Sequence, residues 1–391
     1  MGVNITPHER DVANISRLSV NFNRGGFETP NRFVMRHDLN AKSGIGADID
    51  LTSKRNLFIC EEEINEDVLN DLSTRNGFLG EFKSILEKPL DRVESTKSLK
   101  AVFPKVIKKV KPLMSSDGST RDNVTHFVLD LMSELDVDLY LLQVELLSDP
   151  VIKYLGSLGR QYAPIFDIHD YKNIVARLPN FIDESPDTVP FIGFTFALYP
   201  NAYLAYRYVM SNMEKIHEKN KGILSVEIPR NLGNENSTNV DTDISAPHYS
   251  SFLISDITAE IYRPKRDIKK KKGPEGDSNA EEPRRYTRIF EKKDLALPVI
   301  AQGCNPADHE GEDDFLGPDE NLRKLFWRTL SLQNTPEDRR KNRPGFMSRI
   351  HESLMTTVEY ENMQKSILNH ELLEYRRNKI RMNDLLTQQS L

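Results

Sequence analysis

The sequence predicts an α/β fold, namely a (β/α) barrel with a C-terminal helical extension. Helix-like and strand-like segments alternate between residues 123 and 265, a pattern typical of parallel strands joined by crossover helices. The strands are almost continuously apolar, which indicates a sheet covered on both faces. No glycine-rich turn follows the first strands, and this favours a barrel over a doubly wound open sheet, the alternative architecture.

The central region contains the clearest elements. Strands are expected at 138–146, 162–168, 189–197 and 222–228, and again from about residue 252 within the stretch PHYSSFLISDITAEIYRPK, 247–265. Helices are expected at 123–134, 150–158, 170–180 and 201–219. Each predicted strand is followed by a helix of the length that a crossover needs, so the region reads as a series of β/α units.

The N-terminal third is less regular. Strands are predicted at 17–23, after Thr29-Pro30, and at 56–60, with helical spacing of apolar residues over 66–86. Residues 97–114 form a basic amphipathic segment in which lysines, among them Lys105, alternate with valine and isoleucine. This segment is either a phosphate-facing surface or a solvated edge with its apolar half on the core.

The domain organisation follows from the same pattern. Residues 1–315 are assigned to the barrel, with a charged, low-complexity insertion at 266–287 that is expected to be a flexible surface loop. Residues 316–391 form the helical extension. Its last helical region covers about 348–386, and the basic tail of this region, EYRRNKIR at 374–381, is expected to form an exposed helix suited to packing or to a partner.

Composition restricts the class of protein. The chain has 391 residues, of which 38% are hydrophobic and 29% charged, with a net charge of -6. These values indicate a globular protein with a polar surface. No apolar run reaches the roughly 18 residues of a membrane span, and the N-terminus has no signal core, so a cytoplasmic location is expected. Two cysteines, Cys60 and Cys304, are too few for a disulfide framework.

Polar residues recur where the predicted strands end. In a barrel, catalytic groups lie at the carboxyl ends of the strands. The candidates in chain order are Gln143, Glu145, Asp167, His169, Thr195, Glu227, Arg230, Asp256 and Glu260. Carboxylates and histidine can serve as acids, bases or nucleophiles in a closed mouth. The structural alternative for each is a hydrogen-bonding role at a strand end or a helix N-cap.

Four features in order carry a resemblance: Thr29-Pro30, Gly193, the segment ISDITAEIYRPK at 254–265, and the region of Cys304. Together they resemble the tRNA-guanine transglycosylase family, whose barrel exchanges a nucleobase in RNA or DNA for a 7-deazaguanine. The resemblance covers about residues 20–335 and implies a base-exchange enzyme.

The resemblance also implies roles for particular residues. Asp256 or Glu260 would attack the anomeric carbon, and Glu145 or Asp167 would hold the incoming base. Substrate contacts would come from Gln143, His169, Gly193, Glu227, Arg263 and Lys265. Cys304 and His309 would be the remnant of a zinc site, so the cofactor is either zinc or none.

Two hypotheses about function follow. The first is a divergent nucleobase-exchange enzyme acting on RNA or DNA. The alternative is a non-catalytic barrel that serves as a binding or assembly subunit in a nucleic-acid-related system. In either case RNA or DNA is an expected partner, a protein partner or a second copy would bind through the C-terminal helix, and no membrane association is expected.

Overall fold

The structure is a computed structural model. It describes the following residues: 2–10, 16–36, 38–40, 56–93, 97–107, 110–111, 114, 117–183, 188–195, 202–226, 244–245, 255–259, 286–288, 296–297, 299–301 and 343–379.

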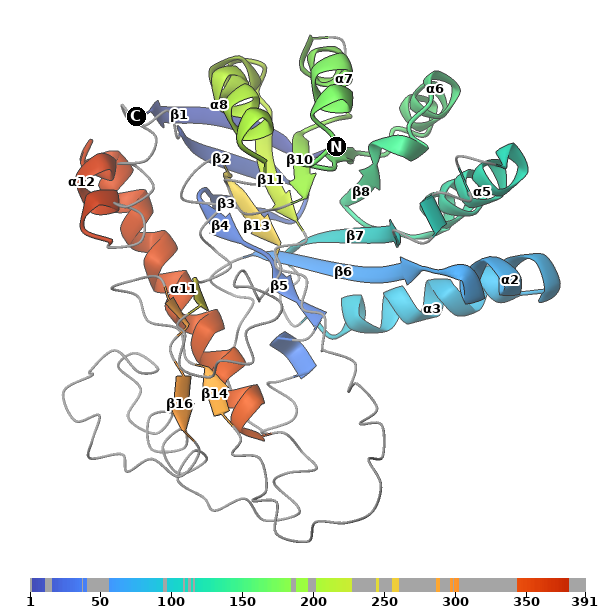
Figure 1. The fold of residues 1–391 in the computed structure, drawn as a ribbon, viewed down its shortest axis with the longest axis horizontal. Coiled ribbons are helices and arrows are strands. Elements are labelled where there is room, and N and C mark those ends of the chain that lie inside the picture. Colours follow the sequence, from blue (N-terminus) through green and yellow to red (C-terminus); the bar gives the residue numbers. More distant parts are fainter. Residues whose placement is uncertain are drawn as a thin grey trace, which may run out of the picture.

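The main sheet is parallel and returns to its starting point. Its strand order is β4-β13-β11-β10-β9-β8-β7-β6-β5 (Figure 1). The two outer members, β4 (Asn31–Arg32) and β5 (Val34–Met35), are separated in sequence by Phe33 alone. They therefore form one interrupted strand that pairs with β13 on one side and with β6 on the other. The predicted α/β barrel is confirmed in this form.

The remaining barrel strands follow one another around the sheet. Their bounds are β6 Leu57–Ile64, β7 Leu99–Val106, β8 Leu139–Gln143, β9 Tyr162–Phe166, β10 Phe191–Thr195, β11 Gly222–Val226 and β13 Ile257–Ala259. Most are short and fully buried, as expected for strands covered on both faces. The basic segment at 97–114 proves to contain β7, so it is a barrel strand rather than a solvated edge.

Helices follow most of these strands and cover the outside of the sheet (Figure 1). Their bounds are α2 Glu66–Thr74, α3 Phe78–Asp91, α5 Gly118–Glu134, α6 Asp149–Leu158, α7 Tyr171–Asp183 and α8 Tyr203–Glu218. A 3-10 turn, η1, covers Val144–Leu146 after β8. The sequence predicted a single helical region at 66–86, whereas Gly77, with φ of 83°, separates α2 from α3. A left-handed φ of this kind favours glycine.

Side chains alternate between two apolar cores. One face of each strand packs against the helices, for example Tyr140, Phe166 and Ile192. The other face fills the barrel, for example Leu141 and Ile165. This period of two is the ordinary consequence of strand geometry, and it shows which residues point into the barrel.

An antiparallel sheet at the N-terminus closes the amino end of the barrel. It consists of β1 Asn4–Arg10, β2 Ser16–Phe22 and β3 Gly25–Glu28. Ile5, Leu18 and Val20 belong to the same buried cluster as the barrel interior. The side chain of Gln161, just before β9, donates a 3.0 Å hydrogen bond to the carbonyl of Val3. The N-terminal sheet therefore covers the amino end of the barrel interior.

The C-terminal helices are part of the barrel wall rather than an appendage. They are α11 Arg343–Leu368 and α12 Leu372–Arg377. The Tyr360 hydroxyl of α11 bonds that of Thr258 in β13 at 2.7 Å, and both are buried. Gln364 donates to the carbonyls of Glu28 and Pro30. In the tail at 374–381, where an exposed helix was expected, Arg376 and Lys379 are buried, so that expectation is wrong for these two residues. Binding of a partner through the C-terminal helix stays a prediction.

Smaller pairs complete the described structure. β12 (Ile244–Ser245) pairs with β15 (Ala296–Leu297), and β14 (Tyr286–Arg288) pairs with β16 (Val299–Ala301), both antiparallel. β15 and β16 both lie within the apolar sequence LALPVIA at 295–301. None of the helices in the described ranges has the length and apolar character needed to cross a bilayer.

Candidate active site at the carboxyl end of the barrel

The inward-facing side chains change character near the carboxyl end of the barrel. In five consecutive strands an apolar interior residue (glycine in β10) is followed, two positions later, by a polar one. The apolar members are Ile59, Phe103, Leu141, Ile165 and Gly193. The polar members are Glu61, Lys105, Gln143, Asp167 and Thr195, and we call them the polar layer. They share the inward face of their strands, so they lie above the apolar side chains that fill the barrel, on the side of its carboxyl end.

Glu61 and Lys105 form an ion pair across the inside of β6 and β7. The Nζ atom of Lys105 lies 3.6 Å from Oε1 of Glu61, and the two side chains are 4% and 13% exposed respectively. Burying such a pair contributes little net stability, because desolvation offsets the Coulomb attraction. Apolar side chains would fill the same space without the desolvation free energy of two buried charges. The pair is therefore a candidate for a functional role.

Asp167 and Thr195 are hydrogen-bonded neighbours at the ends of β9 and β10. The Thr195 hydroxyl donates to Oδ1 of Asp167 at 3.4 Å and accepts a 3.1 Å bond from the amide of Ile168. The same carboxylate oxygen accepts a 3.1 Å bond from the amide of His169. Asp167 is partly exposed and held in one orientation, which is the requirement for a carboxylate that binds or reacts with a substrate.

Gln143 and Glu145 lie at the same end but are held by internal contacts. The Gln143 side chain accepts a 2.7 Å bond from the amide of Val106 and donates a 3.2 Å bond to its carbonyl. It thereby extends the pairing of β7 with β8 beyond their backbone ladder. Glu145, in η1, forms a 2.7 Å ion pair with Lys111.

His169 and Gly193 lie at different depths. His169 is exposed on the turn that leads into α7. Gly193 lies below the polar layer, where a Cβ would overlap Cδ1 of Ile165 and lie 3.6 Å from Cβ of Leu224. The glycine therefore leaves room for the side chains that fill the barrel, while its contact with a substrate stays a prediction.

Asp256 lies at the opposite end of the barrel. It precedes β13, and its carboxylate accepts a 2.7 Å bond from the amide of Ile223, the second residue of β11. The same oxygen is 3.0 Å from Nε2 of His217, and Asp256 is fully buried. The structure therefore does not bring Asp256 together with Gln143 and Asp167, contrary to the expectation that it ends a strand.

Other predicted site residues lie outside the described residues: Glu227, Arg230, Glu260, Arg263, Lys265, Cys304 and His309. Their roles, including the zinc site, stay predictions. Within the described ranges no group of three or more His, Cys, Asp or Glu side chains has a metal-binding arrangement.

Sequence reasoning missed Glu61 and the inward position of Lys105. The signal was present in the alternation Leu99, Ala101, Phe103, Lys105, which places the lysine on the same strand face as three apolar residues. This alternation was overlooked because the segment contains many lysines. It was interpreted from its charge and not from the alternation of inward and outward side chains along a strand.

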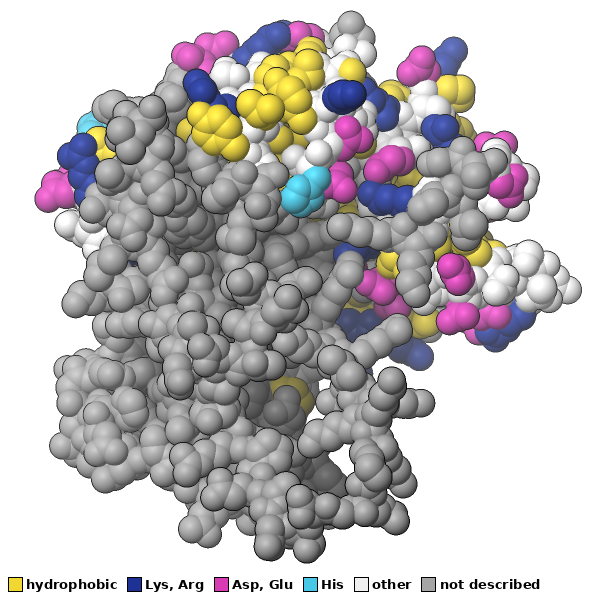
Figure 2. All heavy atoms as spheres, in the orientation of Figure 1, with side chains coloured by type: hydrophobic (Ala, Val, Ile, Leu, Met, Phe, Trp, Pro, Cys, Tyr) yellow, Lys and Arg dark blue, Asp and Glu magenta, His cyan; other side chains and the backbone are white. Residues whose placement is uncertain are grey.

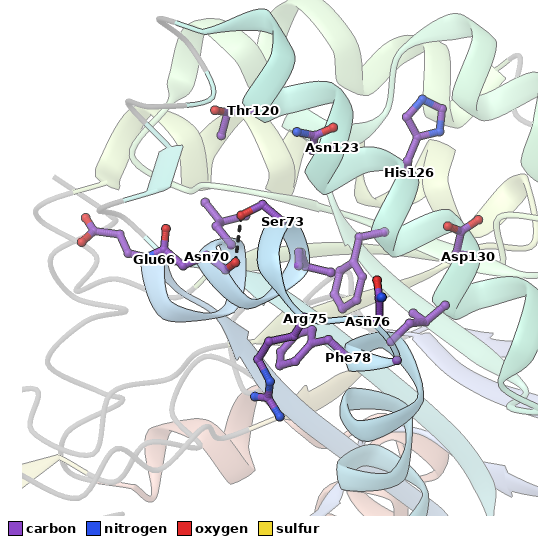
Figure 3. Close-up of a pocket in the computed structure, with 15 residues that line it drawn as sticks. Glu66, Asn70, Ser73, Arg75, Asn76, Phe78, Thr120, Asn123, His126 and Asp130 are labelled. Atoms are coloured by element: carbon purple, nitrogen blue, oxygen red, sulfur yellow. Dashed lines mark hydrogen bonds between the residues drawn. The ribbon is translucent and has the colours of Figure 1, made fainter.

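A cleft in the described part of the structure lies outside the barrel. This cleft of about 670 Å³ separates α2 and the start of α3 from α5 (Figure 3). Thr120, Asn123, His126 and Asp130 line it from α5, and Asn70 and Ser73 line it from α2. The cleft contains none of the sequence-predicted site residues and no member of the polar layer.

Cys60 is expected to be chemically inert. Its side chain points outward from β6 into the helix-covered core, and burial raises the pKa of its thiol to about 12. At pH 8 about one molecule in ten thousand carries the reactive thiolate. We expect Cys304→Ser protein to react with Ellman's reagent only after unfolding in guanidinium. A stoichiometric reaction in the native state within minutes would contradict the burial.

The raised pKa of Cys60 also determines how its contribution to folding stability depends on pH. The unfolded thiol loses its proton near its ordinary pKa of 9.0, well before the folded one does. The contribution of Cys60 to stability is therefore complete below pH 9 and declines as the pH rises above it.

No protein-family model matches the chain, and no curated protein matches it. The function must therefore be inferred from the geometry of the site and from the resemblance of its sequence features.

Proposed function

We propose that the protein is a divergent nucleobase-exchange enzyme whose active site is the carboxyl end of the barrel. One observation carries the proposal: inward-facing polar side chains lie toward the carboxyl ends of β6, β7, β8 and β10 and directly after β9, above an apolar interior that is closed at the other end. Active sites of (β/α) barrels lie at this end. The choice of base exchange among barrel chemistries rests on the sequence resemblance.

Asp167 is the proposed base-binding residue. Its carboxylate is partly exposed and oriented by Thr195 and by the amide of His169. A carboxylate held in this way can accept hydrogen bonds from the N–H groups along one edge of a purine-like base. Lys105 supplies a cation within the polar layer, where an ammonium group can donate to a carbonyl oxygen of the base.

Glu260 is the proposed nucleophile, since Asp256 lies at the closed end. In the first step a Glu260 carboxylate oxygen would bond to the anomeric carbon while the glycosidic C–N bond breaks, and the departing base would take up a proton. In the second step a nitrogen of the incoming base would displace the carboxylate and release its own proton. The exchange is balanced without an oxidant or reductant.

The test is transfer of radiolabelled guanine into nucleic acid by the purified full-length chain. RNA and single-stranded DNA are offered separately, and acid-precipitable label is counted. Asp167→Asn is expected to reduce the rate at least about a hundredfold, because it replaces an oriented acceptor by a group that presents N–H donors to the base. Asp136→Asn is the matched control: that carboxylate is 88% exposed and precedes β8 at the closed end.

The outcomes separate the two hypotheses about function. Label transfer that depends on Asp167 supports the proposal. Absence of transfer with both nucleic acids, while one of them binds, would favour the alternative of a non-catalytic binding barrel. The engagement of Gln143 by the Val106 backbone and of Glu145 by Lys111 is the observation that favours this alternative.

A further inference from the structure

The cleft between α2 and α5 presents polar side chains that have no partner among the described residues. Its volume of about 670 Å³ falls within the range of small-molecule sites. The side chains of Asn70, Asn123, His126 and Asp130 line it, and none of the four makes a hydrogen bond or an ion pair with another described residue. The cleft therefore offers several unused donors and acceptors to a ligand.

The two carboxylates of the cleft lie at its opposite ends (Figure 3). Glu66 is the first residue of α2, and Asp130 lies about one turn before the end of α5. Asn70 and Asn123 lie between them. The lining residues of α5 run from Thr120 to Asp130, which corresponds to about 15 Å of helix. The cleft is therefore elongated, with a negative charge at each end.

Apolar side chains form the floor of the cleft. Leu69, Leu72 and Leu79 are partly buried lining residues that pack against the hydrophobic core. Phe78 and Phe127 also line it, with their rings stacked and their centroids 6.4 Å apart. An aliphatic chain placed on this floor would remove apolar surface from water, which favours a ligand that contains one.

The charge of the cleft is acidic. Arg75 is the only arginine or lysine among the described lining residues, and its guanidinium lies 3.0 Å from Asp71 and 2.7 Å from Glu81. In Figure 3 the Arg75 side chain points away from α5. Its two carboxylate partners thus neutralise this cation outside the cleft, while Glu66 and Asp130 form no ion pair within the described part of the chain.

Basic residues on the neighbouring helices are also engaged elsewhere. Lys83 of α3 lies 3.6 Å from Glu134, and Arg121 of α5 donates a 3.3 Å bond to the carbonyl of Glu145. Figure 2 shows acidic and uncharged polar side chains at the right edge of the molecule, over α2 and α5, with basic side chains below α2. The cleft therefore favours a cationic ligand and opposes an anionic one.

We infer that the cleft binds a linear polyamine, which is an aliphatic chain with a primary ammonium group at each end. One ammonium group pairs with Glu66 and the other with Asp130, while the methylene groups lie over the leucines of the floor. The amide oxygens of Asn70 and Asn123 accept hydrogen bonds from a secondary ammonium group between the ends. The separation of the two carboxylates selects an extended chain over a compact metal ion. The inference goes beyond the proposed function, because no residue of the polar layer takes part.

The test is equilibrium dialysis of the full-length protein against radiolabelled spermidine at low ionic strength, where screening of the charges is weakest. Saturable binding of one spermidine per chain is expected. Glu66→Gln and Asp130→Asn should each weaken binding about fivefold, as for loss of one partly exposed ion pair, and the two together about twentyfold. Asn123→Trp should also weaken binding, because its ring fills the middle of the cleft without changing the charge.

Asp136→Asn is the matched control, since it removes the same charge from an 88% exposed position outside the cleft. Equal weakening in Asp136→Asn and Asp130→Asn would show that spermidine responds only to net charge and would overturn the inference. Binding that Asn123→Trp leaves unchanged would place the ligand elsewhere and overturn it as well. Octanediol, an uncharged chain of similar length, should not compete; competition equal to that of unlabelled spermidine would assign the cleft to an apolar ligand. Absence of saturable binding would also overturn the inference, and none of these outcomes depends on base exchange.

Discussion

Replacement of Asp256 by alanine is expected to lower the free energy of unfolding by about 3 kcal/mol. The carboxylate is fully buried and serves the amide of Ile223 and the ring of His217. Its removal leaves both groups buried without their acceptor, and each such loss costs about 1–3 kcal/mol. Urea unfolding followed by circular dichroism measures the effect, and Asp256→Asn should lose less because its amide oxygen still accepts one bond.

The Asp256→Asn variant also tests whether Asp256 is a structural residue at the closed end of the barrel or a catalytic residue at the carboxyl end. If Asp256 is structural, Asp256→Asn protein that remains folded should bind RNA and exchange guanine as the wild type does. The control Asp136→Ala, at an exposed position, should change stability by no more than about 0.5 kcal/mol. Unchanged stability together with lost exchange would return Asp256 to the catalytic residues and contradict the placement at the closed end.

The barrel could be predicted because each of its strands and helices is indicated by a pattern within a short stretch of sequence. Each of the segments 139–143, 162–166, 191–195 and 222–226 is a short apolar run flanked by a helical period, and the structure forms a strand at each. Closure was not visible in the sequence. It depends on the pairing of β4 with β13, which joins Asn31 to Ile257 across more than half of the chain.

The positions of the site residues were harder to predict than the elements that carry them. Asp167 was found because β9 ends just before it, where the strand pattern stops. Asp256 was misplaced because an extended segment was expected from about residue 252, whereas β13 begins at Ile257. A shift of a few residues relative to a short strand moves a side chain from one end of the barrel to the other.

The C-terminal helix α11 shows a different limit of prediction from sequence, namely that the burial of charged residues could not be foreseen. The buried face of α11 contains charged and polar residues, among them Arg349, Glu352 and Glu359. Helical periodicity read from apolar residues therefore locates this helix but does not show that its charged residues are buried. The partners that bury these charges come from distant parts of the chain: Asp38 for Arg349, and Lys379 of the segment after α12 for Glu359.

Replacement of Asp38 by alanine is expected to cost about 3–5 kcal/mol, since it removes one partner of a buried ion pair. Oδ1 of Asp38 lies 2.6 Å from Nε of Arg349 in α11, and Oδ2 lies 3.7 Å from a guanidinium nitrogen of Arg32 in β4. Oδ2 also accepts a 2.9 Å bond from the amide of Met35. One carboxylate thus joins α11 to the interrupted strand that closes the barrel, and urea unfolding should show the loss.

The chain contains a control that matches this pair in distance but not in burial. Lys215 and Asp183 are also 2.6 Å apart, but their side chains are 46% and 40% exposed, against 4% and 0% for Arg349 and Asp38. Asp183→Ala should therefore cost no more than about 1 kcal/mol. Arg349 also pairs with the buried Glu352 at 3.1 Å. Replacing Arg32, Arg349 and Glu352 by methionine and Asp38 by leucine together should therefore recover most of the loss, because the two guanidinium groups and the two carboxylates of this network are then removed together. Equal losses in Asp38→Ala and Asp183→Ala would show that α11 is held by its apolar contacts alone.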